Sequence, residues 1–225
     1  MSKSSAKRFC WMILILVSLV VCSGCKERVQ KITSKLPKLP KGSSTVEEEM
    51  ELDPFNKITI NVLTADFTIR HGSGYQLKVK RSKKYKLDVD VKSHTLTIRD
   101  AKVGQDGTAS IEVMIPMDAK LKKINASTEV GDVKVQRIKA KKAELYCGVG
   151  NCVLKKCNMR RISASGDTGN IRFVSLAGLK DTAFNVSVEE GNVYWKGNAR
   201  GSSFARKKGK RFITSHLETG DIRIE

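Results

Sequence analysis

The chain of 225 residues carries 42 Lys and Arg against 23 Asp and Glu, so its formal net charge is +19. Such a surplus favours anionic partners, although solvated strand faces and loops explain it equally well. Only 6% of the residues are aromatic, and nucleic-acid recognition is disfavoured because it commonly relies on stacked aromatic side chains. The length suits one domain with tails and a substantial core.

A targeting segment is predicted over residues 1–25. Lys3, Lys7 and Arg8 give it a basic start, and the run 9–21 is uncharged and mostly apolar. These thirteen residues would span about 20 Å as a helix, less than the roughly 30 Å of a bilayer's hydrocarbon core. We therefore interpret the run as the core of a signal peptide rather than as a transmembrane helix.

The end of this segment, Ser23-Gly24-Cys25, resembles a bacterial lipoprotein lipobox. Cys25 would then be lipidated and become the mature N-terminus, although Cys22 stands where such boxes usually have Leu. An uncleaved signal anchor and ordinary secretion are the alternatives, but the basic flank from Lys26 to Lys35 would tend to be held in the cytoplasm. The expected location is the cell membrane, with the domain anchored on its extracytoplasmic side.

Residues 26–54 are expected to form a linker that is first basic and then acidic. Pro37, Pro40 and Gly42 interrupt regular structure in its first part. The acidic run is interpreted as a solvated lead-in to the domain in preference to a metal site, with a short helix as the alternative. It consists of Glu47, Glu48, Glu49, Glu51 and Asp53. The folded domain is predicted over residues 55–225.

Strands are predicted wherever apolar residues alternate, since successive side chains on a strand point to opposite faces. The alternating stretches before residue 120 are Ile58–Val62, Leu77–Val79, Leu87–Val91, Leu96–Ile98 and Ile111–Ile115. Among them, Ala65-Asp66-Phe67-Thr68-Ile69 has the form of the repeat described next, with Ala in the place of Gly.

A five-fold repeat organises the C-terminal half, in the form Gly, Asp or Asn, apolar, any, apolar. Its glycines are spaced by 19, 19, 22 and 29 residues and are Gly131, Gly150, Gly169, Gly191 and Gly220. Gly-Asx is a turn signal, and the residues two and four positions later share one strand face. One unit cannot bury that face alone, so neighbours must stack. The predicted fold is all-β, with stacked β-strand repeats forming a β-solenoid and a two-layer β-sandwich as the alternative.

The sequence resembles the bacterial putative-adhesin family, a domain of unknown function, over roughly residues 55–225. The segments that carry the resemblance are Phe55-Asn56-Lys57-Ile58-Thr59-Ile60, Ala65-Asp66-Phe67-Thr68-Ile69-Arg70-His71-Gly72, Leu96-Thr97-Ile98, Ile111-Glu112-Val113-Met114-Ile115-Pro116 and the Gly-Asx units. The resemblance implies a β-repeat domain at the cell envelope, and it transfers no catalytic residue.

The three cysteines of the repeats are interpreted as core thiols. Cys147, Cys152 and Cys157 match no zinc-ligand spacing, and they fall in apolar columns of a single repeat. A disulfide is the first alternative and a metal site the second. The Asp and Asn residues after the glycines are interpreted as turn formers in preference to weak Ca²⁺ ligands. No nucleophile elbow, HExxH or P-loop occurs, so we predict no cofactor, no metal and no enzyme activity.

Two basic patches contain the candidate binding residues. The first recurs in the segments that return from one repeat to the next and contains Lys141, Lys142, Lys155 and Lys156. The second lies in the longest insertion between repeats and contains Lys207, Lys208, Lys210 and Arg211. In a stack, the return segments would align into a ridge.

The favoured function is adhesin-like binding of anionic envelope polymer, lipid headgroups or another surface protein. The alternatives are self-association through exposed β-edges and a purely solubilising role for the charge.

Overall fold

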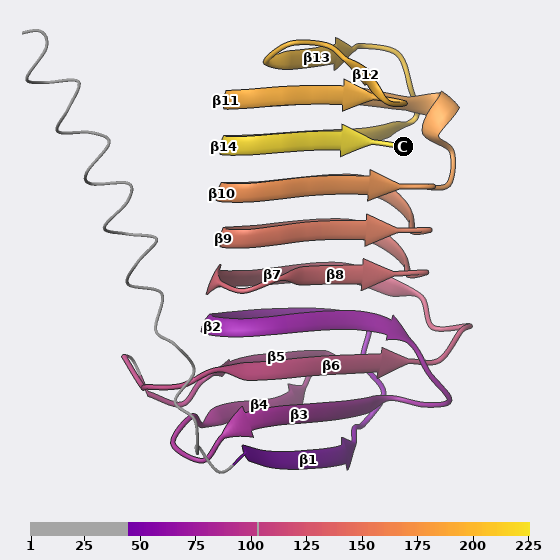
Figure 1. Ribbon diagram of the computed structural model, residues 1–225. Coiled ribbons are helices and arrows are strands. Elements are labelled where there is room, and N and C mark those ends of the chain that lie inside the picture. The colour runs from indigo at the N-terminus through magenta and orange to yellow at the C-terminus, as the bar shows by residue number, and fades with distance from the viewer. Residues whose placement is uncertain (1–44, 103) are drawn as a thin grey trace, which may run out of the picture. The chain divides into compact units, whose positions relative to one another are not determined.

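The computed structural model describes residues 45–102 and 104–225, whose strands belong to one β-sheet (Figure 1). In chain order the elements are β1 (Thr45–Glu51), β2 (Lys57–His71), β3 (Gln76–Ser82), β4 (Leu87–Lys92), β5 (Thr95–Asp100), β6 (Ala109–Ile115), β7 (Leu121–Val130), β8 (Val133–Gln136), β9 (Lys139–Lys155), β10 (Asn158–Val174), the 3₁₀ turn η1 (Leu179–Asp181), β11 (Thr182–Trp195), β12 (Asn198–Ala199), β13 (Ser203–Arg206) and β14 (Arg211–Ile224). Within the described ranges, no helix has the length and apolar character needed to span a bilayer.

The long strands stack in parallel, in the order β2, β7 with β8, β9, β10, β14 and β11 (Figure 1). Their repeats are in register, since Gly150 pairs with Gly169, and Gly220 pairs with both Gly169 and Gly191. The prediction of an all-β fold built from stacked repeats is therefore confirmed.

Each repeat turns two corners, and the burial pattern shows where. In β9, Cys147 and Cys152 are both buried although they are five residues apart, so the alternation of faces is interrupted between them, where Gly150 has φ 148°. A second interruption lies between Leu154 and Cys157, where Lys156 has φ 54°. Two corners per repeat turn a straight strand into a coil.

The predicted inward columns form the core. The residues two and four positions after each repeated glycine are buried, except for the half-buried Trp195. Two buried hydroxyls on the strand segments before the glycines donate hydrogen bonds to carbonyls of the neighbouring coil, from Thr128 Oγ1 to Ala65 O at 3.1 Å and from Ser215 Oγ to Ala164 O at 2.8 Å. Each coil thus buries its apolar face against the coils on either side, which is the main source of stability in such stacks.

The fourth and fifth repeats stack in the reverse of their sequence order. β14, which carries the last repeat, lies between β10 and β11 and pairs in parallel with both (Figure 1). The chain therefore leaves β10, skips one strand position to form β11, and returns through residues 196–210 to fill the gap. The long spacing between Gly191 and Gly220 reflects this return path.

The insertion between β11 and β14 covers the last coil. β12 and β13 pair antiparallel with β11, and two further hydrogen bonds join Val188 N to Ser202 O and Val193 N to Gly201 O, each at 2.8 Å. An aromatic cluster packs beneath them, with Phe204 stacked on Trp195 at 5.3 Å between ring centroids. The outer edge of β11 is therefore occupied, which prevents pairing with another chain there.

Most of the acidic run forms strand β1, which corrects its interpretation as a solvated lead-in or a short helix. Residues 26–44 of the predicted linker lie outside the described residues. β1 pairs antiparallel with β3 and forms an edge of the sheet. The physical reason is charge compensation across the pair, because the cations of β3 lie opposite the carboxylates of β1. The ion pairs are Lys80–Glu47 at 2.5 Å, Lys78–Glu49 at 3.0 Å and Arg81–Glu48 at 2.6 Å.

Replacing the corner glycine Gly169 by Ala is expected to destabilise the domain by roughly 2 to 5 kcal/mol. Its φ is 142°, and a Cβ there would overlap the carbonyl oxygen of Gly150 in the next coil. The matched control is Gly74→Ala, because a Cβ at Gly74 meets no atom within 4 Å. Urea denaturation followed by circular dichroism measures both variants, and equal stability of the two would contradict the role of the corner.

Candidate functional site

Cations recur at one position in four successive coils. Lys57 of β2 pairs with Lys123 of β7, Lys123 pairs with Lys142 of β9, and Lys142 pairs with Arg161 of β10. Exposed Lys122, Lys141 and Arg160 precede the last three of these residues in the chain. We call these seven residues the cationic ridge, which follows the stacking direction along the edge where the chain returns from one coil to the next.

The insertion extends this ridge. In the next coils Phe212 and Ala183 occupy the position of Arg161, and Gly209 lies directly against the backbone of Thr182 and Ala183. The exposed insertion lysines beside Gly209 are Lys207, Lys208 and Lys210. The structure therefore brings most of the two predicted patches onto one edge of the stack.

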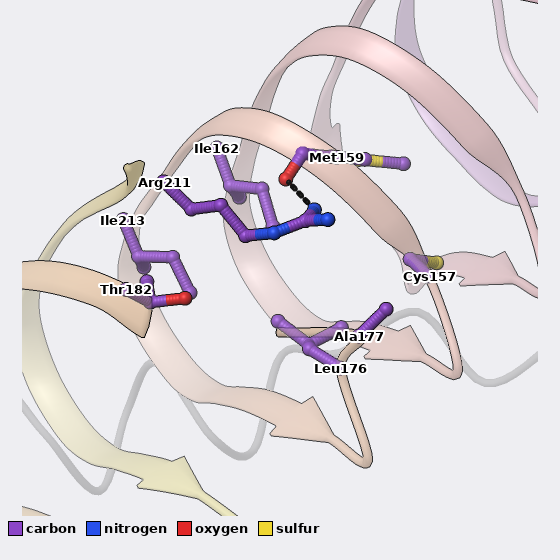
Figure 2. A pocket seen from close by; sticks show the side chains of 8 residues that line it. All are labelled: Cys157, Met159, Ile162, Leu176, Ala177, Thr182, Arg211 and Ile213. Carbon is purple, nitrogen blue, oxygen red and sulfur yellow. Dashed lines mark hydrogen bonds between the residues drawn. The ribbon is translucent and has the colours of Figure 1, made fainter. Parts of the chain in front are cut away.

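Arg211 has a different role from the one predicted. It lies beside a small cavity (Figure 2) and donates hydrogen bonds to Asn158 Oδ1 at 2.7 Å and to Met159 O at 2.8 Å. The cavity, about 10 Å³ in volume, has room for one water molecule at most. Arg211 thus joins β14 to the preceding coil, and its guanidinium is committed to protein acceptors.

Arg206, at the other end of the same basic stretch, is also held within the protein. Its guanidinium lies 4.8 Å from the ring centroid of Phe184 and 5.2 Å from that of Trp195. It donates hydrogen bonds to the carbonyls of Leu179 and Thr182. The side chain therefore fixes the insertion onto β11.

Lys155 and Lys156 lie at the second corner of their coil, away from the paired row. Both are exposed, and Lys156 stacks beside Arg137, since Arg137 N donates to Lys155 O at 2.8 Å. Lys142, in contrast, forms an ion pair with Glu144, which also bridges to Lys123 Nζ at 2.5 Å. Hydrogen bonds from Lys123 and Lys142 lower the pKa of Glu144, so one carboxylate offsets part of the ridge's charge.

Carboxylates recur on the same outer face, six residues along the strand from the ridge. This acidic row stands two residues before four of the five Gly-Asx corners and contains Glu129, Asp167, Glu218 and Glu189. Tyr146 donates a hydrogen bond to Asp167 Oδ2 at 2.9 Å, and this bond, with burial, raises the pKa of Tyr146 to about 12. The face is therefore polarised, with cations along one edge and carboxylates near the other.

The Asp and Asn residues after the glycines form a hydrogen-bonded ladder along the corner. Asp66 accepts from Asp132 N at 2.7 Å, Asp132 accepts from Asn151 N at 3.0 Å, and Asn151 accepts from Asn170 Nδ2 at 3.1 Å. Asn170 and Asp221 continue the series to the last coil. Burial alone would raise the pKa of Asp132, but hydrogen bonds from Asn151 and Lys134 outweigh it and lower that pKa. The ladder supports the interpretation of these residues as turn formers.

One constellation that sequence reasoning did not single out is exposed. Ser187 Oγ lies 3.1 Å from His216 Nδ1, and Glu189 Oε1 lies 3.5 Å from His216 Nε2. These residues come from neighbouring strands of the open sheet face, where the His216 and Glu189 side chains are 50% and 65% exposed. Reactive constellations usually sit where water is excluded, so we interpret this one as a surface contact.

The three cysteines are free thiols in the core. Cys147, Cys152 and Cys157 are each at most 3% exposed, and burial raises the pKa of all three thiols, to about 12 for Cys147 and about 11 for Cys157. This agrees with their interpretation as small hydrophobic residues. Over residues 45–102 and 104–225, no group of three or more His, Cys, Asp or Glu side chains is arranged to hold a metal ion.

Comparison with known proteins identifies relatives of the fold. Residues 55–224 match the family described as Toastrack DUF4097, and no curated protein matches the sequence. The chain is similar to a putative cell adhesion protein from Clostridium sporogenes, with 17% identity and a TM-score of 0.61 over 80% of this chain and 99% of that one. It is also similar to a putative adhesin from Parabacteroides merdae, with 12% identity and a TM-score of 0.44 over 81% and 82%. At these identities, the first likeness shows a shared fold.

The core thiols are expected to resist alkylation in the native protein. At pH 8 a thiol with the pKa of Cys157 is about one part in a thousand thiolate. Iodoacetamide labelling with mass-spectrometric mapping should leave all three cysteines unmodified until urea is added. Because the folded protein holds these thiol protons more tightly than the unfolded chain does, the free energy of unfolding is expected to fall as the pH rises from 9 to 11. Labelling of native Cys157 at the rate of a free thiol would contradict the expected protection.

Proposed function

The chain belongs to the Toastrack DUF4097 family, and on that premise we propose that it is a non-enzymatic, envelope-anchored surface domain whose cationic ridge binds an anionic component of the cell envelope. The ridge carries the proposal, because cations in four successive coils stand side by side and the insertion lysines follow on the same edge. An aligned array concentrates positive potential more than scattered charges do. An adhesin-like role agrees with the related fold of the putative cell adhesion protein.

The anchor in this proposal is Cys25, which lies outside the described residues. Lipidation there would place the basic residues that follow it beside the membrane, where each cation close to an anionic surface contributes about 1 kcal/mol. The folded domain would then stand on the extracytoplasmic side, where envelope polymers are accessible.

Self-association through β-edges receives less support from the described part of the chain. The edge of β11 is covered by β12 and β13. At the other end β1 is short, and it carries Glu47, Glu49 and Glu51, which are features that protect edge strands from pairing. The ridge is therefore the surface that we assign to a partner.

Neutralising the unpaired cations of this edge is expected to weaken binding to polyphosphate by about tenfold to a hundredfold at low salt, since each cation close to an anionic surface contributes about 1 kcal/mol. The variant is Lys122→Gln, Lys141→Gln and Arg160→Gln, three exposed residues of the ridge, in the full chain carried in nanodiscs of neutral lipid. The control removes as many charges from the exposed segment between β3 and β4, through Lys83→Gln, Lys84→Gln and Lys86→Gln. Equal losses in the two variants would show that net charge, rather than the ridge, governs binding.

Replacing Cys25 by Ser is expected to release the protein from the membrane fraction of a bacterial host. Mass spectrometry of the wild-type N-terminus should find a diacylglyceryl group on Cys25. The matched control is Cys22→Ser, which should stay membrane-bound. An intact Met1, together with a domain protected from external protease, would place the domain in the cytoplasm and overturn the proposed anchor.

A further inference from the structure

We infer that the ligand of the cationic ridge is a linear polyanion that lies along the stacking direction and contacts one coil after another. This inference rests on the proposed function and specifies its ligand. It follows from the shape of the charged surface, which is long in one direction and narrow in the other.

The long direction is set by strand pairing. Lys57, Lys123, Lys142 and Arg161 occupy neighbouring strands in register, so their Cα atoms repeat at the strand spacing of about 4.8 Å. From β2 through β7, β9, β10 and β14 to β11 there are five such steps, and β13 adds a sixth. The ridge with its insertion lysines is therefore about 29 Å long.

The short direction is limited by other side chains on the same face. Two residues along the strand from Lys142 stands Glu144, already engaged by two lysines. Asp167 of the acidic row lies six residues after Arg161, which is about 20 Å along the strand. A flat anionic bilayer laid on this face would meet these carboxylates together with the cations, whereas a single polymer chain can follow the ridge alone.

Phe212 adds an apolar contact within the same line. It occupies the ridge position between Arg161 and the insertion, is 47% exposed, and lies 6.0 Å from the guanidinium carbon of Arg161. A polymer with carbon-containing repeat units would contact the ring while its anionic groups pair with the cations on either side. A simple inorganic anion would gain nothing from the ring.

The test is the dependence of affinity on polymer length. Size-fractionated polyphosphate is titrated against the full chain in neutral nanodiscs, with fractions whose extended length lies below, near and above about 29 Å. We expect the affinity per chain and the salt dependence of binding to rise with length and to level off once the polymer spans the ridge. Triphosphate that binds as tightly as the long fractions would overturn the inference and indicate a point site.

Variants at the two ends of the ridge sharpen the test. The end variant combines Lys57→Gln with Lys207→Gln, Lys208→Gln and Lys210→Gln. In this variant the affinity should level off at a shorter polymer length, while short fractions bind as tightly as they bind the wild type. The control is the off-ridge variant at Lys83, Lys84 and Lys86, which should leave the plateau length unchanged. A plateau that stays in place in the end variant would contradict binding along the whole ridge. Unchanged thermal unfolding in each variant excludes a folding defect.

A lipid ligand is distinguished by repeating the titration in nanodiscs that contain phosphatidylglycerol. If lipid headgroups occupied the ridge, the anionic lipid would lower the polyphosphate affinity of the wild type at least tenfold more than that of the Lys122, Lys141 and Arg160 variant. That result would make the inference wrong. We expect equal falls in the two proteins. Polyphosphate binding that is identical for wild type and ridge variant at every length would instead remove the proposed function itself.

Discussion

The close approach of one coil's backbone to the next at the glycine corners is the constraint on which the structure depends. The carbonyl oxygen of Gly150 occupies the space that a Cβ of Gly169 would need, and the same relation links Gly169 to Gly220 and Gly220 to Gly191. Only glycine permits both this contact and a φ near 140°. Because each corner must lie directly on the next, register is fixed for the whole stack.

Once register is fixed, any residue type repeated at the corner spacing becomes a continuous line on the molecule. Apolar residues after the corner become core columns, and the Asp and Asn residues become a ladder of hydrogen bonds. The ridge has the same origin, since Lys123, Lys142 and Arg161 are spaced by 19 residues like the first three glycines. The fold class, the buried columns and the place of Lys141 and Lys142 on the ridge could therefore be predicted from periodicity, whereas Lys155 and Lys156 lie at another corner.

Features set by long-range pairing could not be predicted in this way. The position of β14 between β10 and β11 depends on which free edge the returning chain meets, and the repeat motif is equally compatible with either order. The acidic strand β1 has a composition that disfavours strands, and only the cations of β3 explain it. Arg211 has the same charge as Lys210, but it is close enough to Asn158 and Met159 to be held by them.

The insertion between β11 and β14 has two roles, since it extends the cationic ridge and covers the edge of β11. The fourth and fifth repeats have Ala183 and Phe212 where earlier coils have cations, so their own strands would end the ridge at Arg161. They also end at β11, whose free edge would be open to other chains. One segment answers both needs, because Arg206 and Phe204 hold it on β11 while its lysines remain exposed beside the ridge. The packing that closes the end of the core thereby also lengthens the charged surface that we assign to the ligand.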